Sequence, residues 1–317
     1  MQTSQRRRSI YARCILASCI LVAHAAVATA APSASYSARR HAFRTKIRDT
    51  PRRRFPSPTP PPEIYEKVKY AAPLGSNTAY VTPLHRDGKK RPAIVWIQGG
   101  FYWGVDNSAW APAPRTNDQS ARAFREAGLV EMLPSLRGCD DNPGDREYFL
   151  GEVDDVLAAI DYLRKRADVD PTRVYLGGHS TGGTLALLVA ASRPPVRAVF
   201  AFGPIARVDW YGTTGTALDG ADADEVAMRS PATWLSQVTA PVFVIEAAAR
   251  GNAASFEPLR AAAGRAPVRF LLVHGATHFS TLAPITELIA ARVMREAAER
   301  IPFSLDEADL AAAFAAH

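Results

Sequence analysis

Short hydrophobic runs alternate with longer amphipathic segments from residue 63 almost to the end of the chain. The hydrophobic runs, each of strand length, cover residues 65–70, 78–82, 93–97, 129–133, 173–176, 198–202, 242–245 and 268–273. Segments with helical spacing lie between most of them, at 117–127, 146–166, 182–192, 255–263 and 284–299. This alternation predicts an α/β fold, in which helices cover both faces of a mostly parallel, eight-stranded sheet. Because only a short turn separates the first two runs, we expect them as antiparallel additions at one edge.

The first 30 residues follow a different pattern. Four arginines lie among the first 13 residues, an apolar run covers 14–27, and the tripeptide 28–30 has the small-x-small form of a cleavage site. We therefore predict a signal peptide over 1–30 and export to the periplasm or the medium. Two alternatives remain open. One is a lipoprotein signal ending at Cys19, and the other is an uncleaved membrane anchor, although the run is shorter than the ~17 to 25 residues of a spanning helix.

Positive charge is concentrated in the same part of the chain. Residues 1–62 hold 12 of the 38 Lys and Arg residues and one of the 31 acidic residues, which leaves 26 basic and 30 acidic residues in 63–317. The pI near 9.5 therefore belongs to the N-terminal part. A mildly acidic body argues against nucleic acid as a partner, because neutralising phosphates requires basic side chains clustered on the folded surface.

Residues 31–62 are rich in Arg, Ser and Pro, and they end in a proline-rich stretch. Such a segment has few apolar side chains to offset the entropy cost of ordering, so we predict a disordered linker. Its positive charge offers contact with an anionic envelope or membrane surface, and a solvated spacer is the alternative. The remaining residues, 63–317, have the length of one domain with a substantial core.

Cysteine and histidine spacing indicates neither a disulfide nor a metal site. Cys139 is the only cysteine after residue 30, so the exported chain has no partner for an intramolecular disulfide. The histidines form no H-E-x-x-H motif, and no glycine-rich phosphate loop is present. We therefore predict no cofactor and no metal.

The strongest chemical signal is a G-x-S-x-G motif centred on Ser180. It follows the hydrophobic run 173–176 and opens the helical segment 182–192, which is the context of a nucleophile elbow. The two glycines permit a turn too tight for side chains, and the turn holds the serine hydroxyl at a helix N-terminus. There the backbone N–H of Thr181 can stabilise an oxyanion. The alternative is a glycine-rich turn without catalytic function.

A second glycine-rich loop follows the run 93–97. Its backbone N–H of Phe101 or Gly100 is the candidate for the other oxyanion donor, because glycines let the backbone approach a substrate closely. The aromatic residues after the glycines, with Tyr102 among them, favour the wall of a substrate pocket over a plain strand-ending turn.

The catalytic base is expected after the last strand, because the triad order on this fold is serine, acid, histidine. His278 precedes the last long helix and is the first candidate, while His274 is interpreted as a packing residue at the strand end. The acid is less well defined by the sequence. Glu246 at the end of the run 242–245 ranks first, followed by Asn252 and Asp209.

Several motifs in order resemble the α/β-hydrolase domain of the prolyl oligopeptidase family, with dienelactone hydrolases as near relatives. They are Gln98-Gly99-Gly100-Phe101, Leu136-Arg137-Gly138, Glu152-Val153-Asp154-Asp155-Val156, Gly178-His179-Ser180-Thr181-Gly182-Gly183, Arg229-Ser230-Pro231 and Gly275-Ala276-Thr277-His278-Phe279. The resemblance covers about residues 65–294. It implies that Ser180 is the nucleophile and His278 the base, and that Trp210 and Tyr211 form a pocket wall.

The chain also departs from that family in two places. The roughly 30 residues between 63 and the third run are too few for the N-terminal β-propeller of the family's peptidases. The family's acid position after the seventh strand is occupied by Arg250 in an ungapped reading.

The sequence thus predicts an exported serine hydrolase that cleaves an ester or peptide-like amide bond in a small molecule or short peptide. Carboxylesterases and prolyl oligopeptidase-like peptidases use the same nucleophile, base and oxyanion donors, so the motifs do not distinguish the two activities. The alternative is a catalytically impaired binding protein of the cell envelope that kept the fold.

Overall fold

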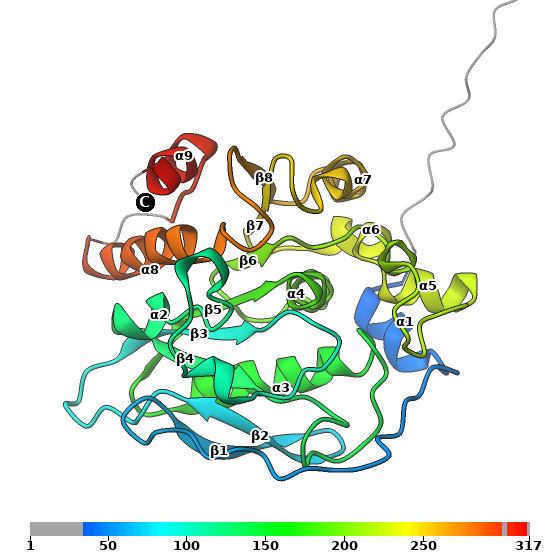
Figure 1. The fold of residues 1–317 in the computed structure, drawn as a ribbon, viewed down its shortest axis with the longest axis horizontal. Coiled ribbons are helices and arrows are strands. Elements are labelled where there is room, and N and C mark those ends of the chain that lie inside the picture. Colours follow the sequence, from blue (N-terminus) through cyan, green and yellow to red (C-terminus); the bar gives the residue numbers. More distant parts are fainter. Residues whose placement is uncertain (1–33, 300–302, 316–317) are drawn as a thin grey trace, which may run out of the picture. The chain divides into compact units, whose positions relative to one another are not determined.

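A computed structural model describes residues 34–299 and 303–315 as an eight-stranded sheet with helices on both faces (Figure 1). The strand order is β1-β2-β4-β3-β5-β6-β7-β8. The strands are β1 (Glu66–Ala72), β2 (Gly75–Val81), β3 (Arg91–Ile97), β4 (Val130–Pro134), β5 (Val169–His179), β6 (Val199–Phe202), β7 (Val242–Ala247) and β8 (Val268–Val273). β2 pairs antiparallel with β1 and β4, and every pair from β4 to β8 is parallel. The α/β-hydrolase fold with two antiparallel edge strands is therefore confirmed.

The central strands are hydrophobic along their whole length because both faces of the sheet are covered. In β3, Ala93, Val95 and Ile97 belong to one hydrophobic cluster, and Ile94 and Trp96 belong to the cluster on the opposite face. This is the two-residue alternation of a strand. A central strand with a helix layer on each side thus appears in the sequence as an unbroken apolar run.

Two layers of helices provide these covers. The helices are α1 (Tyr36–Ala42), α2 (Ala123–Glu126), α3 (Glu152–Lys165), α4 (Thr181–Ala191), α5 (Ala223–Arg229), α6 (Pro231–Trp234), α7 (Phe256–Ala263), α8 (Leu282–Glu299) and α9 (Glu307–Ala315). Buried side chains of α3, α4, α6 and α7 lie in the first cluster, and those of α2, α8 and α9 lie in the second. Figure 1 shows α3 and α4 on one side of the sheet and α8 on the other.

Two predicted helices are shorter than their sequence pattern. The segment 117–127 is helical only over α2, because Ala121 has a left-handed backbone, with φ of 52°. The segment 146–166 begins its helix at Glu152, since Tyr148 and Phe149 also have positive φ values of 47° and 67°. The carboxylate of Glu152 accepts hydrogen bonds from backbone N–H groups of the preceding turn, which stabilises this irregular loop.

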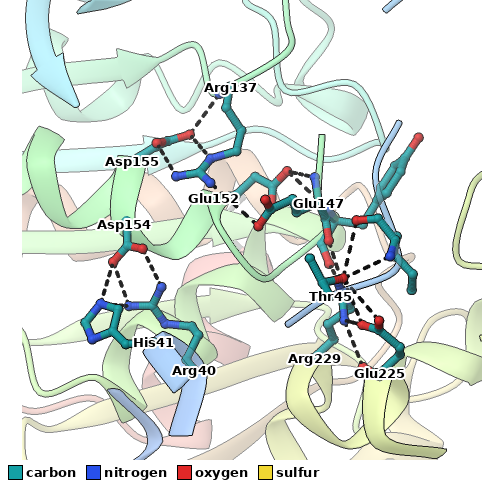
Figure 2. A network of polar contacts seen from close by, with 12 residues as sticks. Arg40, His41, Thr45, Arg137, Glu147, Glu152, Asp154, Asp155, Glu225 and Arg229 are labelled. Atoms are coloured by element: carbon teal, nitrogen blue, oxygen red, sulfur yellow. Dashed lines mark hydrogen bonds and ion pairs between the residues drawn. The ribbon is translucent and has the colours of Figure 1, made fainter. Parts of the chain in front are cut away.

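The prediction of a disordered linker is wrong for residues 34–62. This segment begins with α1 and packs against the hydrolase domain, where Tyr36 is fully buried and its ring lies 5.0 Å from that of Trp234. The guanidinium of Arg40, also buried, makes two hydrogen bonds of 2.6 Å to Asp154 (Figure 2). Composition indicated disorder, but the segment uses a few apolar anchors and arginines that meet acidic groups of the domain.

A second cluster in Figure 2 fixes the segment near residue 45. The carboxylate of Glu225 accepts hydrogen bonds from the Thr45 hydroxyl and the Lys46 backbone N–H. The same carboxylate pairs with Arg229, which is fully buried and also donates to the carbonyl of Tyr148 at 2.8 Å. The N-terminal segment is thereby connected to the loop that carries Tyr148 and Phe149.

The predicted signal peptide lies outside the described residues, as do the lipoprotein and anchor alternatives. Of the helices that the structure describes, none combines the length and the apolar character needed to cross a membrane.

Candidate active site

Ser180 lies between β5 and α4, at the carboxyl edge of the parallel sheet. Its φ of 56° and ψ of −116° are strained values for a residue with a side chain, and its backbone N–H donates to the Phe202 carbonyl at 2.7 Å. This hydrogen bond to β6 helps to hold the strained turn. The strand-turn-helix arrangement is that of a nucleophile elbow, as predicted from the motif.

The two glycines of the motif are required by the close approach of neighbouring backbone. A Cβ atom on Gly178 would lie 2.5 Å from the Gly182 carbonyl oxygen, and one on Gly182 would lie 2.2 Å from that of Ile97. Both distances are shorter than any real contact of a Cβ atom. The elbow thus packs helix against strand too tightly for a side chain at either position.

His278 follows β8, and its imidazole meets the carboxylate of Glu246 at the end of β7. The distance from Nδ1 of His278 to Oε2 of Glu246 is 2.8 Å. Glu246 is 1% exposed, and its two oxygens also accept backbone hydrogen bonds from Ala247 at 2.6 Å and Asn252 at 2.7 Å. A carboxylate acceptor at this position requires the proton on Nδ1, which leaves Nε2 as the free basic nitrogen.

Backbone contacts hold His278 in this position. Its N–H donates to the Arg250 carbonyl at 2.8 Å, and its own carbonyl accepts from Nε2 of His179 at 3.1 Å. Burial lowers the pKa of His179 to about 3, so this ring is neutral, with its hydrogen on Nε2 because a carbonyl can only accept. The residue before the nucleophile therefore positions the loop of the base.

The ring of His278 lies over Gly203, the residue that follows β6. A Cβ atom on Gly203 would lie 2.3 Å from Cε1 of His278, and the backbone at Phe202 is the one that binds the Ser180 N–H. Both residues lie in the described part of the chain, and no hydrogen bond joins Ser180 Oγ to the His278 ring there. Catalytic hydrogen bonds are often long without substrate and tighten when it binds, so the two groups remain a candidate pair.

The glycine loop after β3 reaches the start of α4. The hydroxyl of Thr181 donates to the Gly100 carbonyl, and Gly100 has a φ of 98° that favours glycine. A cavity of about 370 Å³ opens beside the loop. It is lined by Gln98, Gly99, Gly100, Phe101, Tyr102, Gly104, Asp106, Ser108, Ala113, Asn117 and Gln119. Both candidate oxyanion donors of the loop thus line this cavity, and Gly100 also contacts the residue after Ser180.

The predicted pocket residues occupy different surroundings. Tyr102 lines the cavity and is 47% exposed, and Trp210 is 49% exposed. Tyr211 is packed, because its ring stacks on Phe149 at 5.9 Å and its hydroxyl shares a hydrogen bond with Thr184. No motif pointed to Phe149 as a neighbour of the pocket, since the helical pattern of 146–166 predicts it inside a helix.

The alternative candidates serve other roles. Asn252 contacts the Glu246 carboxylate through its backbone, and its side chain donates to the Gly203 carbonyl at 2.8 Å. Asp209 pairs with Arg207 at 2.7 Å, and both side chains are about half exposed. His274 is exposed, so its interpretation as a packing residue was wrong. Among the described residues, no group of three His, Cys, Asp or Glu side chains is placed to hold a metal ion.

Known proteins match this chain in sequence and in fold. The profile of the prolyl oligopeptidase family matches residues 118–277. An uncharacterized protein of Mycobacterium tuberculosis is 29% identical over 248 residues, covering 73% of this chain and 83% of that protein. An esterase of the hyperthermophilic archaeon Pyrobaculum calidifontis has a TM-score of 0.56 at 18% identity, over 75% of this chain and 87% of the esterase.

A puromycin-hydrolyzing peptidase of Mycobacterium tuberculosis has a TM-score of 0.59 at 19% identity, over 74% of this chain but 40% of the peptidase. The part of the chain seen in the structure forms the hydrolase fold and contains no β-propeller. On the family match, the chain belongs to the prolyl oligopeptidase family, and it is a serine hydrolase with the α/β-hydrolase fold.

Proposed function

We propose that the protein hydrolyses an ester or a peptide-like amide through an acyl-enzyme formed on Ser180. The observation that carries this proposal is the hydrogen bond between His278, on the loop that lies over the elbow, and the buried carboxylate of Glu246 in β7. A chain that had become only a binding protein would have no need to keep this buried carboxylate aimed at an imidazole.

In the proposed first step, Ser180 Oγ attacks the carbonyl carbon of the substrate while Nε2 of His278 takes the hydroxyl proton. The oxyanion that forms is bound by the backbone N–H of Thr181 and by that of Gly100 or Phe101. Glu246 holds the ring through Nδ1 and stabilises its charged form. The tetrahedral intermediate then collapses, and the imidazolium gives its proton to the departing alcohol or amine.

In the second step, water replaces the leaving group. His278 takes a proton from the water as its oxygen attacks the acyl carbon, and it returns the proton to Ser180 Oγ when the carboxylic acid product leaves. Only one base is needed for both steps, because the imidazole alternates between its neutral and charged forms.

The position of Glu246 bears on the missing aspartate of the family. Arg250 occupies the position in which the family pattern has an acid, but its backbone carbonyl binds the His278 N–H. The acid comes instead from the end of β7. The longer glutamate side chain reaches the imidazole from there, and Gly251 leaves it room, since a Cβ atom on Gly251 would lie 2.4 Å from the carboxylate.

A substrate panel tests this function. Purified protein should hydrolyse short acyl esters of p-nitrophenol or aminoacyl and X-Pro amides of a chromogenic amine, and Ser180→Ala should remove that activity. Because Ser180→Ala removes only the hydroxyl oxygen, the activity left in this variant measures contamination and spontaneous hydrolysis. Hydrolysis at equal rates by both proteins would refute the proposal.

We also propose that residues 1–30 direct export and are removed before Ala31. The sequence pattern of these residues supports this proposal. N-terminal sequencing of the protein recovered from a periplasmic extract should begin at Ala31, and a chain that keeps Met1 in the cytoplasm would contradict it.

A further inference from the structure

A second cavity, of about 270 Å³, lies where the N-terminal segment meets the hydrolase domain. Its lining comes from both parts: Pro51, Arg52, Arg53 and Phe55 from the segment, and Tyr102, Gly138, Asp140 and Arg146 from the domain. The segment therefore contributes directly to a concave site, beyond its packing against the domain.

Tyr102 joins this cavity to the one beside the oxyanion loop, because its side chain lines both. It follows Phe101, a candidate oxyanion donor, and its hydroxyl donates to Oδ1 of Asp140 at 2.8 Å and accepts from the Asp140 N–H at 2.9 Å. The ring is thus a fixed partition between the two cavities. The two cavities therefore border the same ring, one beside the oxyanion loop and the other beside the N-terminal segment.

The charges around the second cavity favour an anion. Arg52 and Arg53 are exposed and have no carboxylate partner in the part of the chain that the structure describes. Arg146 pairs with Asp49 at 2.7 Å, and its buried Nε makes no hydrogen bond. The acid in the lining, Asp140, already accepts hydrogen bonds on both oxygens, from the Tyr102 and Ser135 hydroxyls.

The walls also offer apolar surface. Phe55 is 54% exposed and Tyr102 is 47% exposed, and the guanidinium of Arg53 lies 5.3 Å from the centre of the Phe55 ring. Exposed aromatic rings next to unpaired guanidinium groups suit a ligand with an apolar stem and an anionic end.

We propose that this cavity, the arginine subsite, binds an anionic group at the far end of the substrate. The preferred substrates are then esters or amides whose chain ends in a carboxylate. This inference rests on the proposed function, because it assigns the substrate class of the same active site.

Two series of esters test the subsite. The first places the charge on the acyl side, with p-nitrophenyl hydrogen succinate, adipate and suberate against the corresponding methyl esters. The second places it on the leaving-group side, with butyryl esters of hydroxy acids of increasing length against their methyl esters. In at least one series, kcat/KM should favour the charged member about tenfold at its best chain length, as a few partly exposed ion pairs can provide. The preference should shrink as salt is added.

Matched variants locate the effect. Arg52→Gln/Arg53→Gln should remove most of the preference for the charged esters. Arg39→Gln/Arg48→Gln carries the same change of net charge in the same segment, at two exposed positions outside the cavity, and should leave kcat/KM unchanged for both kinds of ester. Equal losses in the two double variants would refute a specific subsite, because they would indicate only a long-range effect of charge.

The outcomes separate this inference from the proposed function. Cleavage of the neutral esters without any preference for charge would overturn the subsite and leave the serine hydrolase intact. Absence of all hydrolysis would count against the proposed function. In that case the affinity for a dicarboxylate tests the arginine subsite on its own. In titration calorimetry, adipate should bind the wild-type protein about tenfold more tightly than Arg52→Gln/Arg53→Gln, and equal affinities would overturn it.

Discussion

Replacement of Gly203 by alanine should disable the active site while the fold remains intact. The added Cβ atom would lie 2.3 Å from Cε1 and 2.6 Å from Nδ1 of His278, and 2.9 Å from Oε2 of Glu246. Ordinary van der Waals contact begins near 3.4 Å. The imidazole must therefore move by about 1 Å, which also breaks its 2.8 Å hydrogen bond to Glu246.

The substitution should lower both the activity and the stability, for separate reasons. A displacement of about 1 Å in a catalytic group lowers activity by about 10²-fold, and loss of the orienting carboxylate adds to that. Alanine at Gly203, where φ is 57°, costs about 1 to 2 kcal/mol of stability, because a left-handed backbone brings Cβ close to the following carbonyl. We therefore expect kcat/KM to fall at least 10²-fold, with a moderate decrease in the melting temperature.

Gly264→Ala is the matched control. Gly264 has a φ of 55°, and no atom lies within 4 Å of the position its Cβ would take. Its positive φ also disfavours a side chain, so alanine there carries a backbone cost of its own but meets no clash. Thermal unfolding should show destabilisation in both variants, whereas ester hydrolysis should be lost in Gly203→Ala alone. Activity of Gly203→Ala within threefold of Gly264→Ala would refute the placement of His278 over Gly203.

Three further changes test other parts of the account. Glu246→Gln should lower kcat by about 10³-fold or more while Asp209→Asn leaves it near normal, and the reverse order would assign the acid to Asp209. Burial raises the pKa of Glu131 to about 8, so the folded protein keeps a proton that the unfolded chain loses above pH 4.5, and the melting temperature should fall as the pH rises towards 8. This decrease with pH should be smaller in Glu131→Gln, and an equal decrease in both proteins would contradict the prediction. Arg40→Met should cost about 3 kcal/mol in urea unfolding and expose residues 34–62 to trypsin, whereas unchanged digestion would argue against the docking of this segment.

The strand-helix alternation was predictable because the sheet is covered on both faces. Each central strand then becomes a continuous apolar run, and the packing that produces the run also fixes the fold class. Helix starts were less predictable. The loop before α3 depends on the positive φ of Tyr148 and Phe149, and on backbone N–H groups bound by Glu152, none of which changes the helical spacing of the segment.

The N-terminal segment could not be predicted from composition. Its order depends on complementarity with distant residues, as in the pairs of Arg40 with Asp154 and of Lys46 N–H with Glu225. The elbow was predictable because glycine is required by local backbone contacts. The acid was harder to identify, since the direction of the Glu246 side chain depends on hydrogen bonds from two neighbouring N–H groups.

The central claim is that Ser180 is a nucleophile activated by His278. A fluorophosphonate probe, analysed by peptide mass spectrometry, tests it without knowledge of the substrate. The account predicts one adduct per chain, on Ser180, and no labelling in either Ser180→Ala or His278→Ala. Folded wild-type protein that remains unlabelled at every pH from about 6 to 9, a range around the ordinary pKa of histidine, would contradict the claim.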